Sequence, residues 1–262
     1  MSQRRELKED IYIKRIAGQG VFNFILIHNA GGCHKMFTYQ IDTLLRYGDV
    51  ILFDLPGHGK SKPIKDNGIQ HSSKLIARIS QFYSLDNLWL ISLNNGANIA
   101  LNTLQNNLIE ISGMILIDPP LFMDKDFVSE IKTFILKLKD DAYEDFIHSM
   151  VTELLEDSSQ EKRDIAYKAF MSVDRNALKE MFLSLLAWDK DSKRILAATK
   201  TPSLCILTNE HHCTFEAIKK VAPNFTLGKV IGSKCWATLE VPKQVNAMIE
   251  RYLSLQKASA SQ

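Results

Sequence analysis

The chain has 262 residues, which is enough for one large domain or two small ones with a sizeable apolar core. Apolar residues make up 45% of it, charged residues 24%, and the formal net charge is only +2, so composition gives no reason to expect a nucleic acid or an anionic membrane as partner. We find no apolar run near the ~20 residues of a membrane-spanning helix and no signal peptide. We therefore expect a cytoplasmic protein without a membrane span, with its four cysteines reduced.

Short apolar runs alternate with helical patterns over the first 120 residues. Continuous apolar runs bounded by Asp, Pro or Gly are typical of strands that are buried on both faces. Strands are predicted at residues 12–16, 22–27, 50–53, 88–93 and 114–117, and helices at 36–47, 72–83 and 96–108. This alternation predicts an α/β fold with a mostly parallel sheet and helices on both faces.

The pattern changes after Asp118, where two prolines follow. Residues 125–188 show charged amphipathic helical patterns and no strand. Strands and helices then alternate again at residues 203–207, 215–221, 226–231 and 242–255. We therefore divide the chain into the first part of an α/β core (1–120), an inserted helical lid (121–188) and the second part of the core (189–262).

An inserted lid commonly covers a pocket at the carboxyl ends of the strands. The aromatic and methionine side chains of the lid recur at helical spacing, which is typical of core positions. We expect most of them to be core and a subset to line the pocket: Phe134, Phe146, Met150, Phe170, Met171, Met181, Phe182 and Trp188.

The segment Ser92-Leu93-Asn94-Asn95-Gly96 joins the apolar run 88–93 to a helical pattern. Strand, sharp turn and helix form the setting of the nucleophile elbow, G-x-S-x-G, whose turn lifts one side chain above the sheet. Asn94 occupies the position of the serine. A side-chain amide cannot form an acyl intermediate, although asparagine tolerates the positive φ of such a turn. The segment predicts that the turn is kept and the nucleophile is lost.

Four further segments occur in an order typical of one family. His28-Asn29-Ala30-Gly31-Gly32 is similar to a His-Gly oxyanion loop, and residues 54–61 (Asp-Leu-Pro-Gly-His-Gly-Lys-Ser) match the pattern D-x-P-G-H-G-x-S. Residues 201–208 and 232–242 are similar to the family's acid and histidine segments. With the elbow, they make nearly the whole chain resemble the α/β-hydrolase superfamily, which implies the α/β-hydrolase fold.

The resemblance also implies a degenerate catalytic triad. Asn94 replaces the nucleophile, His211 (beside Glu210) stands where the acid is usual, and Cys235 stands at the histidine position. Since the members of a triad act as a unit, ordinary serine-hydrolase activity is not expected.

The backbone could still bind a ligand without cleaving it. The N–H groups of Asn95 and of Asn29 or Ala30 are expected to form an oxyanion-type donor pair for a carbonyl or carboxylate.

Several of these residues have a second interpretation. Asn94 is either a ligand-binding amide or an inert turn residue, and Asp118 either an alternative acid or an ordinary strand end. Cys235 is either a thiolate, if His211 or His212 approached it, or a small residue that fills space.

We predict neither a metal nor a cofactor. The groups His211-His212-Cys213 and Cys33-His34 match no zinc pattern. His58, in the second motif, is interpreted as structural.

The sequence favours a non-hydrolytic protein that binds a small apolar molecule with a carbonyl-type head, or a protein partner. The alternative is an enzyme of hydrolase, lyase or cofactor-free oxygenase type that uses the non-standard residues at the elbow and histidine positions. A third hypothesis is an interaction protein whose pocket has collapsed. The oligomeric state stays open.

Overall fold

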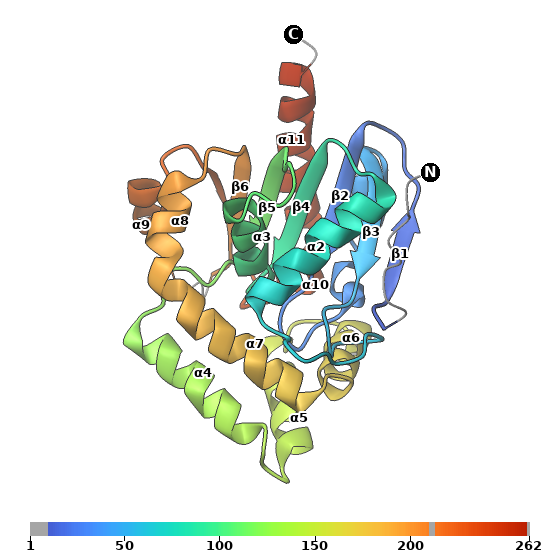
Figure 1. Cartoon of the computed structure of the whole chain (residues 1–262). Coiled ribbons are helices and arrows are strands. Elements are labelled where there is room, and N and C mark those ends of the chain that lie inside the picture. Colours follow the sequence, from blue (N-terminus) through green and yellow to red (C-terminus); the bar gives the residue numbers. More distant parts are fainter. Residues whose placement is uncertain (1–9, 210–212, 261–262) are drawn as a thin grey trace.

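A seven-stranded sheet forms the centre of the molecule in the computed structural model, which describes residues 10–209 and 213–260 (Figure 1). The strand order is β1-β3-β2-β4-β5-β6-β7, with β1 antiparallel to β3 and all the other neighbours parallel. The strands are β1 (Ile13–Ile16), β2 (Phe22–Ile27), β3 (Gly48–Phe53), β4 (Leu88–Leu93), β5 (Gly113–Ile117), β6 (Ser203–Leu207) and β7 (Thr226–Lys229).

The central strands are buried along their whole length, as their continuous apolar runs predicted. Every residue of β2, β4, β5 and β6 is buried, because helices cover both faces of the sheet. Strands β2 and β4 are neighbours, with Ile27 opposite Ser92. The segments that follow these two strands therefore meet at the same edge of the sheet.

Helices α2, α3 and α8 lie on one face of the sheet, and α1 and α11 on the other (Figure 1). The core also contains the short helices α9 and α10 and the 3-10 turns η1 and η2. The bounds of all these elements are η1 (His34–Phe37), α1 (Ile41–Leu45), α2 (Ile69–Tyr83), α3 (Gly96–Gln105), η2 (Asp189–Asp191), α8 (Ser192–Ala198), α9 (Phe215–Val221), α10 (Ala237–Glu240) and α11 (Pro242–Ala260). Across residues 10–209 and 213–260, we find no helix that combines the length and the apolar content needed to cross a bilayer.

Four helices occupy residues 125–188, where the sequence predicted helices and no strand. They are α4 (Lys125–Lys137), α5 (Tyr143–Leu154), α6 (Gln160–Met171) and α7 (Arg175–Trp188). All four gather at one end of the sheet (Figure 1). The carboxylates of Asp124 and Asp174 cap α4 and α7 by accepting backbone N–H groups of their first turns.

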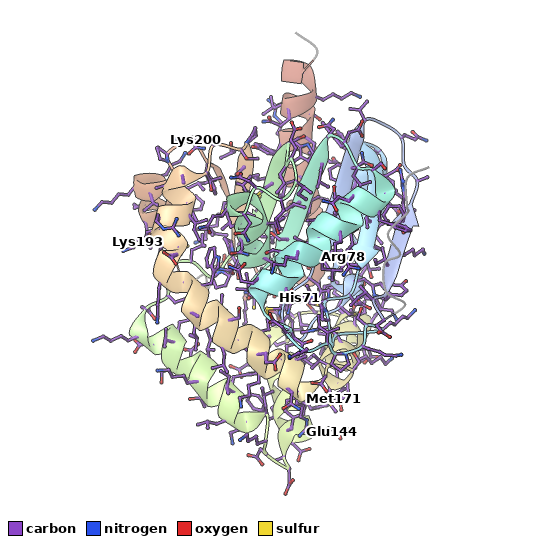
Figure 2. The ribbon with its side chains drawn as sticks, in the orientation of Figure 1. His71, Arg78, Glu144, Met171, Lys193 and Lys200 are labelled. Carbon is purple, nitrogen blue, oxygen red and sulfur yellow. The ribbon has the colours of Figure 1, made fainter. Side chains whose placement is uncertain are left out.

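The helices are amphipathic, as their sequence patterns predicted. Exposed charged side chains such as Arg78 on α2, Glu144 on α5 and Lys193 on α8 lie on the outside of the molecule (Figure 2). On the inner side of the four helices, Phe134 packs against Phe146 and Phe182, with ring centroids 5.5 and 5.1 Å apart. This aromatic cluster faces the end of the sheet that carries the elbow.

One predicted helix is wrong in its extent. Instead of a single helix over residues 36–47, the chain forms η1 and then the short α1. Met36 and Phe37 are fully buried in η1, which packs against β2, α6 and α10. The buried amide of Gln40 donates to the carbonyl of Thr238, 3.2 Å away. These long-range contacts outweigh the local helical pattern.

Candidate ligand-binding site at the elbow

The turn after β4 has the strained geometry of a nucleophile elbow. Asn94 has the positive φ that the sequence predicted, 48°, and its N–H donates to the carbonyl of Ile117, 2.7 Å away. Its own carbonyl accepts the N–H of Ala97 in the first turn of α3. A Cβ at Gly96 would lie 2.4 Å from the carbonyl oxygen of Ile27, so only glycine lets α3 pass this close to β2. The turn holds the Asn94 side chain at the edge of the sheet.

The Asn94 side chain lies against the thiol of Cys235. Its Nδ2 donates to the Cys235 Sγ over 3.7 Å, and its Oδ1 accepts the backbone N–H of Asn95 at 2.9 Å. The second bond assigns the two ends of the amide, because only the oxygen can accept from an N–H. The structure therefore brings together the residues at the nucleophile and histidine positions.

Two of the predicted oxyanion donors, the N–H groups of Ala30 and Asn95, already have partners inside the protein. The Ala30 N–H donates to the Asn95 Oδ1 at 2.6 Å, and the Asn95 N–H donates to Asn94. The Asn29 side chain turns back and donates to the Ala30 carbonyl at 3.0 Å. Because the Asn94 and Asn95 side chains reach these groups themselves, a ligand carbonyl at this place would have to displace a side-chain amide oxygen.

A cavity of about 230 Å³ opens above Asn94. Its lining is mostly apolar and comes from helices α4, α5, α6 and α7, while the elbow and the loop that carries Cys235 form its floor. The lining residues are Asn29, Ala30, Asn94, Asn95, Phe127, Glu130, Ile131, Phe134, Met150, Leu154, Phe170, Phe182, Leu185, Cys235 and Trp236. An open cavity here argues against the hypothesis of a collapsed pocket.

Glu240 holds the loop that presents Cys235. Its carboxylate accepts the backbone N–H groups of Cys235 and Trp236 at 3.1 and 2.6 Å, and that of Lys234 as well. Glu240 is not among the residues that the sequence predicted for the site. Its only local signal is a glutamate that ends the short helix α10, five positions after Cys235.

Asp118 ends β5 beside this loop. It is 5% exposed, has a positive φ of 49°, and accepts the hydroxyl of Thr208 at 2.9 Å. Burial, with a smaller contribution from the charge of Glu240, raises the pKa of its carboxyl to about 7, although the hydrogen bonds from Thr208 act to lower it. Among the described residues, its side chain has no hydrogen bond to Asn94 or Cys235. His211, the residue at the acid position, lies outside the described part of the chain, as do Glu210 and His212.

Two buried histidines hold the neighbouring loops. The His28 Nε2 accepts the N–H of Leu55 at 2.9 Å and its Nδ1 donates to the carbonyl of Asn29, which ties the loop after β2 to the loop after β3. Burial lowers the pKa of His28. Burial also lowers the pKa of His58 to about 3, and its Nδ1 donates to the carbonyl of Pro56. Both rings are neutral at neutral pH.

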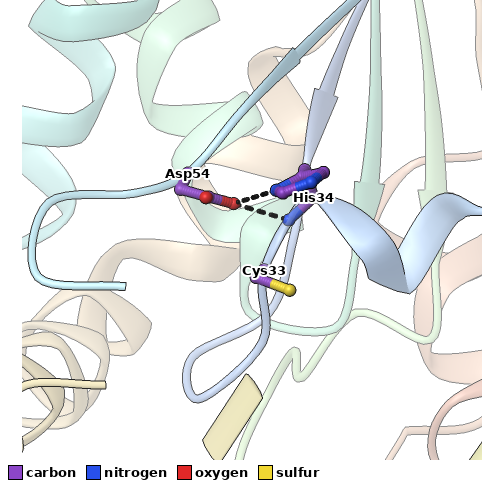
Figure 3. Close-up of side chains that lie close together, drawn as sticks. All are labelled: Cys33, His34 and Asp54. Carbon is purple, nitrogen blue, oxygen red and sulfur yellow. Dashed lines mark hydrogen bonds and ion pairs between the residues drawn. The ribbon is translucent and has the colours of Figure 1, made fainter. Parts of the chain in front are cut away.

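A cysteine, a histidine and an aspartate lie together next to these loops (Figure 3). One ligand atom from each of Cys33, His34 and Asp54 falls within 4.8 Å of the others. However, Asp54 accepts the backbone N–H and the Nδ1 of His34 and the N–H of Lys60, at 2.7–2.9 Å. Burial raises the pKa of the Cys33 thiol to about 11, so this thiol is protonated at neutral pH. The carboxylate is thus engaged in holding the two loops together.

Fold and site together define a class of protein: a mostly parallel sheet with a strained elbow after β4, loops that converge on it, and helices above it. The chain belongs to the α/β hydrolase fold family, which it matches over residues 23–193. A comparison with curated proteins finds no match.

Solved structures share this fold at low sequence identity. An esterase from Thermogutta terrifontis has 17% identity and a TM-score of 0.79, with 93% of each chain covered. A hydrolase from Oleispira antarctica has 18% identity and a TM-score of 0.81, covering 97% of this chain and 98% of the other. An esterase from Exiguobacterium antarcticum has 20% identity and a TM-score of 0.78, covering 93% and 95%. At such identities the likeness shows the fold alone.

Proposed function

We propose that this protein binds a small, largely apolar molecule with a carbonyl-type head in the elbow cavity, and that it does not hydrolyse esters through a serine–histidine–acid triad. The observation that carries the proposal is the amide of Asn94, held against the thiol of Cys235. An amide nitrogen has no usable lone pair, so the side chain at the elbow can bind a ligand but cannot attack it.

The lining of the cavity supports an apolar ligand. Phe127, Phe134, Phe170 and Phe182 contribute aromatic surface, and Glu130 is the one charged residue among the described lining residues. Within the described part of the chain, the Asn94 Nδ2 donates to the sulfur of Cys235 alone, and sulfur is a weak acceptor. A ligand carbonyl would be a better acceptor, so it could replace the thiol as the partner of this amide.

A second function is favoured by one feature, the half-buried Cys235 thiol in the cavity wall. A thiolate at this place could act as a nucleophile on a bound ligand. In this alternative the protein is an enzyme with non-standard chemistry, and alkylation of Cys235 abolishes its turnover.

The test combines ligand binding with ester turnover. Prodan, a neutral naphthalene ketone whose emission shifts in apolar surroundings, is titrated into wild type, Asn94→Ala and Asn107→Ala. Asn107 is the matched control, because it has nearly the same φ as Asn94, 49°, but is exposed and outside the cavity. We expect Asn94→Ala to weaken prodan binding about fivefold, the worth of one hydrogen bond, and Asn107→Ala to leave it unchanged.

Hydrolysis of p-nitrophenyl butyrate is measured on the same three proteins. We expect no release of nitrophenol above background from any of them. A burst that Asn94→Ala abolishes would overturn the proposal. Turnover that is lost on alkylation of Cys235, but kept in Asn94→Ala, would favour the thiol enzyme.

We further propose that residues 121–188 act as the lid of this cavity and that the protein works in the cytoplasm. Cavity-lining residues on all four of the helices α4–α7 support the first statement. The second is supported by four free cysteines, since thiols stay reduced in that compartment. A protein partner bound through the same region is a further possibility under this proposal.

A further inference from the structure

The hydroxyl of Thr208 lies between two acceptors. Thr208 directly follows β6, and its Oγ1 is 2.9 Å from the Asp118 Oδ1 and 3.0 Å from the carbonyl oxygen of Lys234. Thr208 is fully buried. Asp118 and Lys234 thus lie on opposite sides of one hydroxyl, and Lys234 is the residue before Cys235.

A hydroxyl has a single proton, so it cannot donate to both neighbours at once. If Asp118 carries a proton, the acid donates to Thr208 and Thr208 donates to the Lys234 carbonyl, which satisfies both contacts. If Asp118 is ionised, its carboxylate is the stronger acceptor and takes the Thr208 proton. The Lys234 carbonyl then loses its bond from Thr208.

Burial and the charge of Glu240 favour the protonated form of Asp118, whereas the hydroxyl and the N–H of Thr208 favour its carboxylate. Glu240 on α10 places a negative charge nearby, and the thiols of Cys205 on β6 and Cys213 interact with the Asp118 charge. Burial raises the pKa of Cys213 to about 12 and that of Cys205 well above its usual value, so both thiols are protonated and uncharged. No described cation is among the groups that stabilise the carboxylate, whose pKa is about 7.

We propose that Asp118 is a positioning residue that acts through Thr208 on the loop Lys234–Trp236, so that the elbow cavity binds its ligand more tightly when Asp118 carries its proton. Besides the side-chain contacts of Lys234 and Cys235, two described anchors hold the backbone of this loop. Glu240 holds its three N–H groups and Thr208 holds the Lys234 carbonyl. Because Cys235 and Trp236 line the cavity, loss of the second anchor changes the cavity wall.

The consequence for ligands rests on the proposed function, but the loop itself can be followed without a ligand. The backbone amide signals of Cys235 and Trp236 are recorded by NMR between about pH 5 and pH 9, a range that spans the expected titration. In wild type we expect both signals to shift with a midpoint near 7.

Two variants remove, in different ways, the hydrogen-bond relay from Asp118 through Thr208 to the Lys234 carbonyl. Asp118→Asn imitates the protonated acid, because its amide donates to Thr208 at every pH, and it should abolish the shift. Thr208→Val keeps the shape but removes the hydroxyl, so it should also abolish the shift of the loop. Asp189→Asn is the matched control: Asp189 is a second aspartate whose pKa burial raises, but it accepts the N–H groups of Phe122 and Met123 instead. In Asp189→Asn the amide signals of Cys235 and Trp236 should shift with pH as they do in wild type.

Prodan affinity is then compared at about pH 6 and pH 8. We expect wild type to bind about fivefold more weakly at the higher pH, as for one lost hydrogen bond, and Asp118→Asn to bind equally at both. An unchanged loop titration in Asp118→Asn would overturn the inference. If wild type shows the loop titration but binds no prodan, the proposed function fails while the relay stands.

Discussion

The side-chain amide of Asn94 and the thiol of Cys235 lie in contact, 3.7 Å apart, although 141 positions separate them in the chain. The contact arises because Asn94 follows a central strand while Glu240 holds the loop of Cys235 over the same edge of the sheet. A donor amide and a weakly accepting sulfur make a contact that a better acceptor can replace. The floor of the cavity therefore has the chemistry of a binding site rather than that of a nucleophile and its base.

Rebuilding the triad should restore weak ester hydrolysis. We expect Asn94→Ser, Cys235→His and His211→Asp together to hydrolyse p-nitrophenyl acetate slowly. The Ala30 N–H stays blocked by the Asn95 Oδ1. Adding Asn95→Ala should therefore raise the rate of hydrolysis at least ~10-fold, because one oxyanion-hole donor changes kcat by ~10²–10³. The control carries the other three substitutions together with Asn94→Ala in place of Asn94→Ser. If the quadruple variant folds but hydrolyses the ester no faster than background, the elbow or the loop after β2 does not have a competent geometry.

Gly31→Ala should destabilise the protein more than Gly232→Ala. Both glycines have φ +76°, so the backbone strain of the substitution is matched. A Cβ at Gly31 would lie 2.1 Å from the Phe170 ring, whereas one at Gly232 would have 4.0 Å to Val241. For Gly31→Ala we expect an additional loss of about 1–3 kcal/mol in the free energy of unfolding, as for an overpacked core. We also expect weaker prodan binding, because Phe170 lines the cavity. Equal urea midpoints for the two variants would contradict this.

Glu240→Gln should loosen the loop that carries Cys235. The carboxylate accepts three N–H groups, whereas a glutamine offers one acceptor oxygen and turns an NH₂ toward the remaining donors. We expect a loss of about 1–3 kcal/mol in the free energy of unfolding. Glu156→Gln is the control, because the exposed ion pair of Glu156 with Lys234 is worth at most ~1 kcal/mol. A smaller loss for Glu240→Gln than for Glu156→Gln would show that the loop does not depend on the carboxylate.

Asp118 should make the protein less stable as pH rises. The pKa of its carboxyl rises from an ordinary value of 3.8 to about 7 in the fold, so between these values the folded state binds more protons than the unfolded state. Stability is therefore lost as pH increases from about 4 to about 7, by up to ~1.4 kcal/mol per unit, and levels off above. Urea unfolding at a series of pH values measures this slope. In Asp118→Asn the part of the slope that comes from Asp118 should vanish. If this variant has the same dependence of stability on pH as wild type, the slope does not come from Asp118.

Much of the fold followed from local patterns. The apolar runs at residues 22–27 and 88–93 coincide with β2 and β4, since a strand buried on both faces needs an uninterrupted apolar run. The single helix expected over residues 36–47 does not form, because buried contacts of Met36, Phe37 and Gln40 with distant elements bend the chain there. Local propensity is too weak to resist such contacts.

The sequence by itself determined the order of strands and helices, the motif loops and the positive φ of Asn94, because periodicity and turn chemistry act over a few residues. Only the tertiary structure decided which polar groups meet. Asn95 reaches Ala30 across 65 positions and Asp118 reaches Thr208 across 90. Such partners depend on which strands are neighbours in the sheet, and spacing along the chain does not encode that.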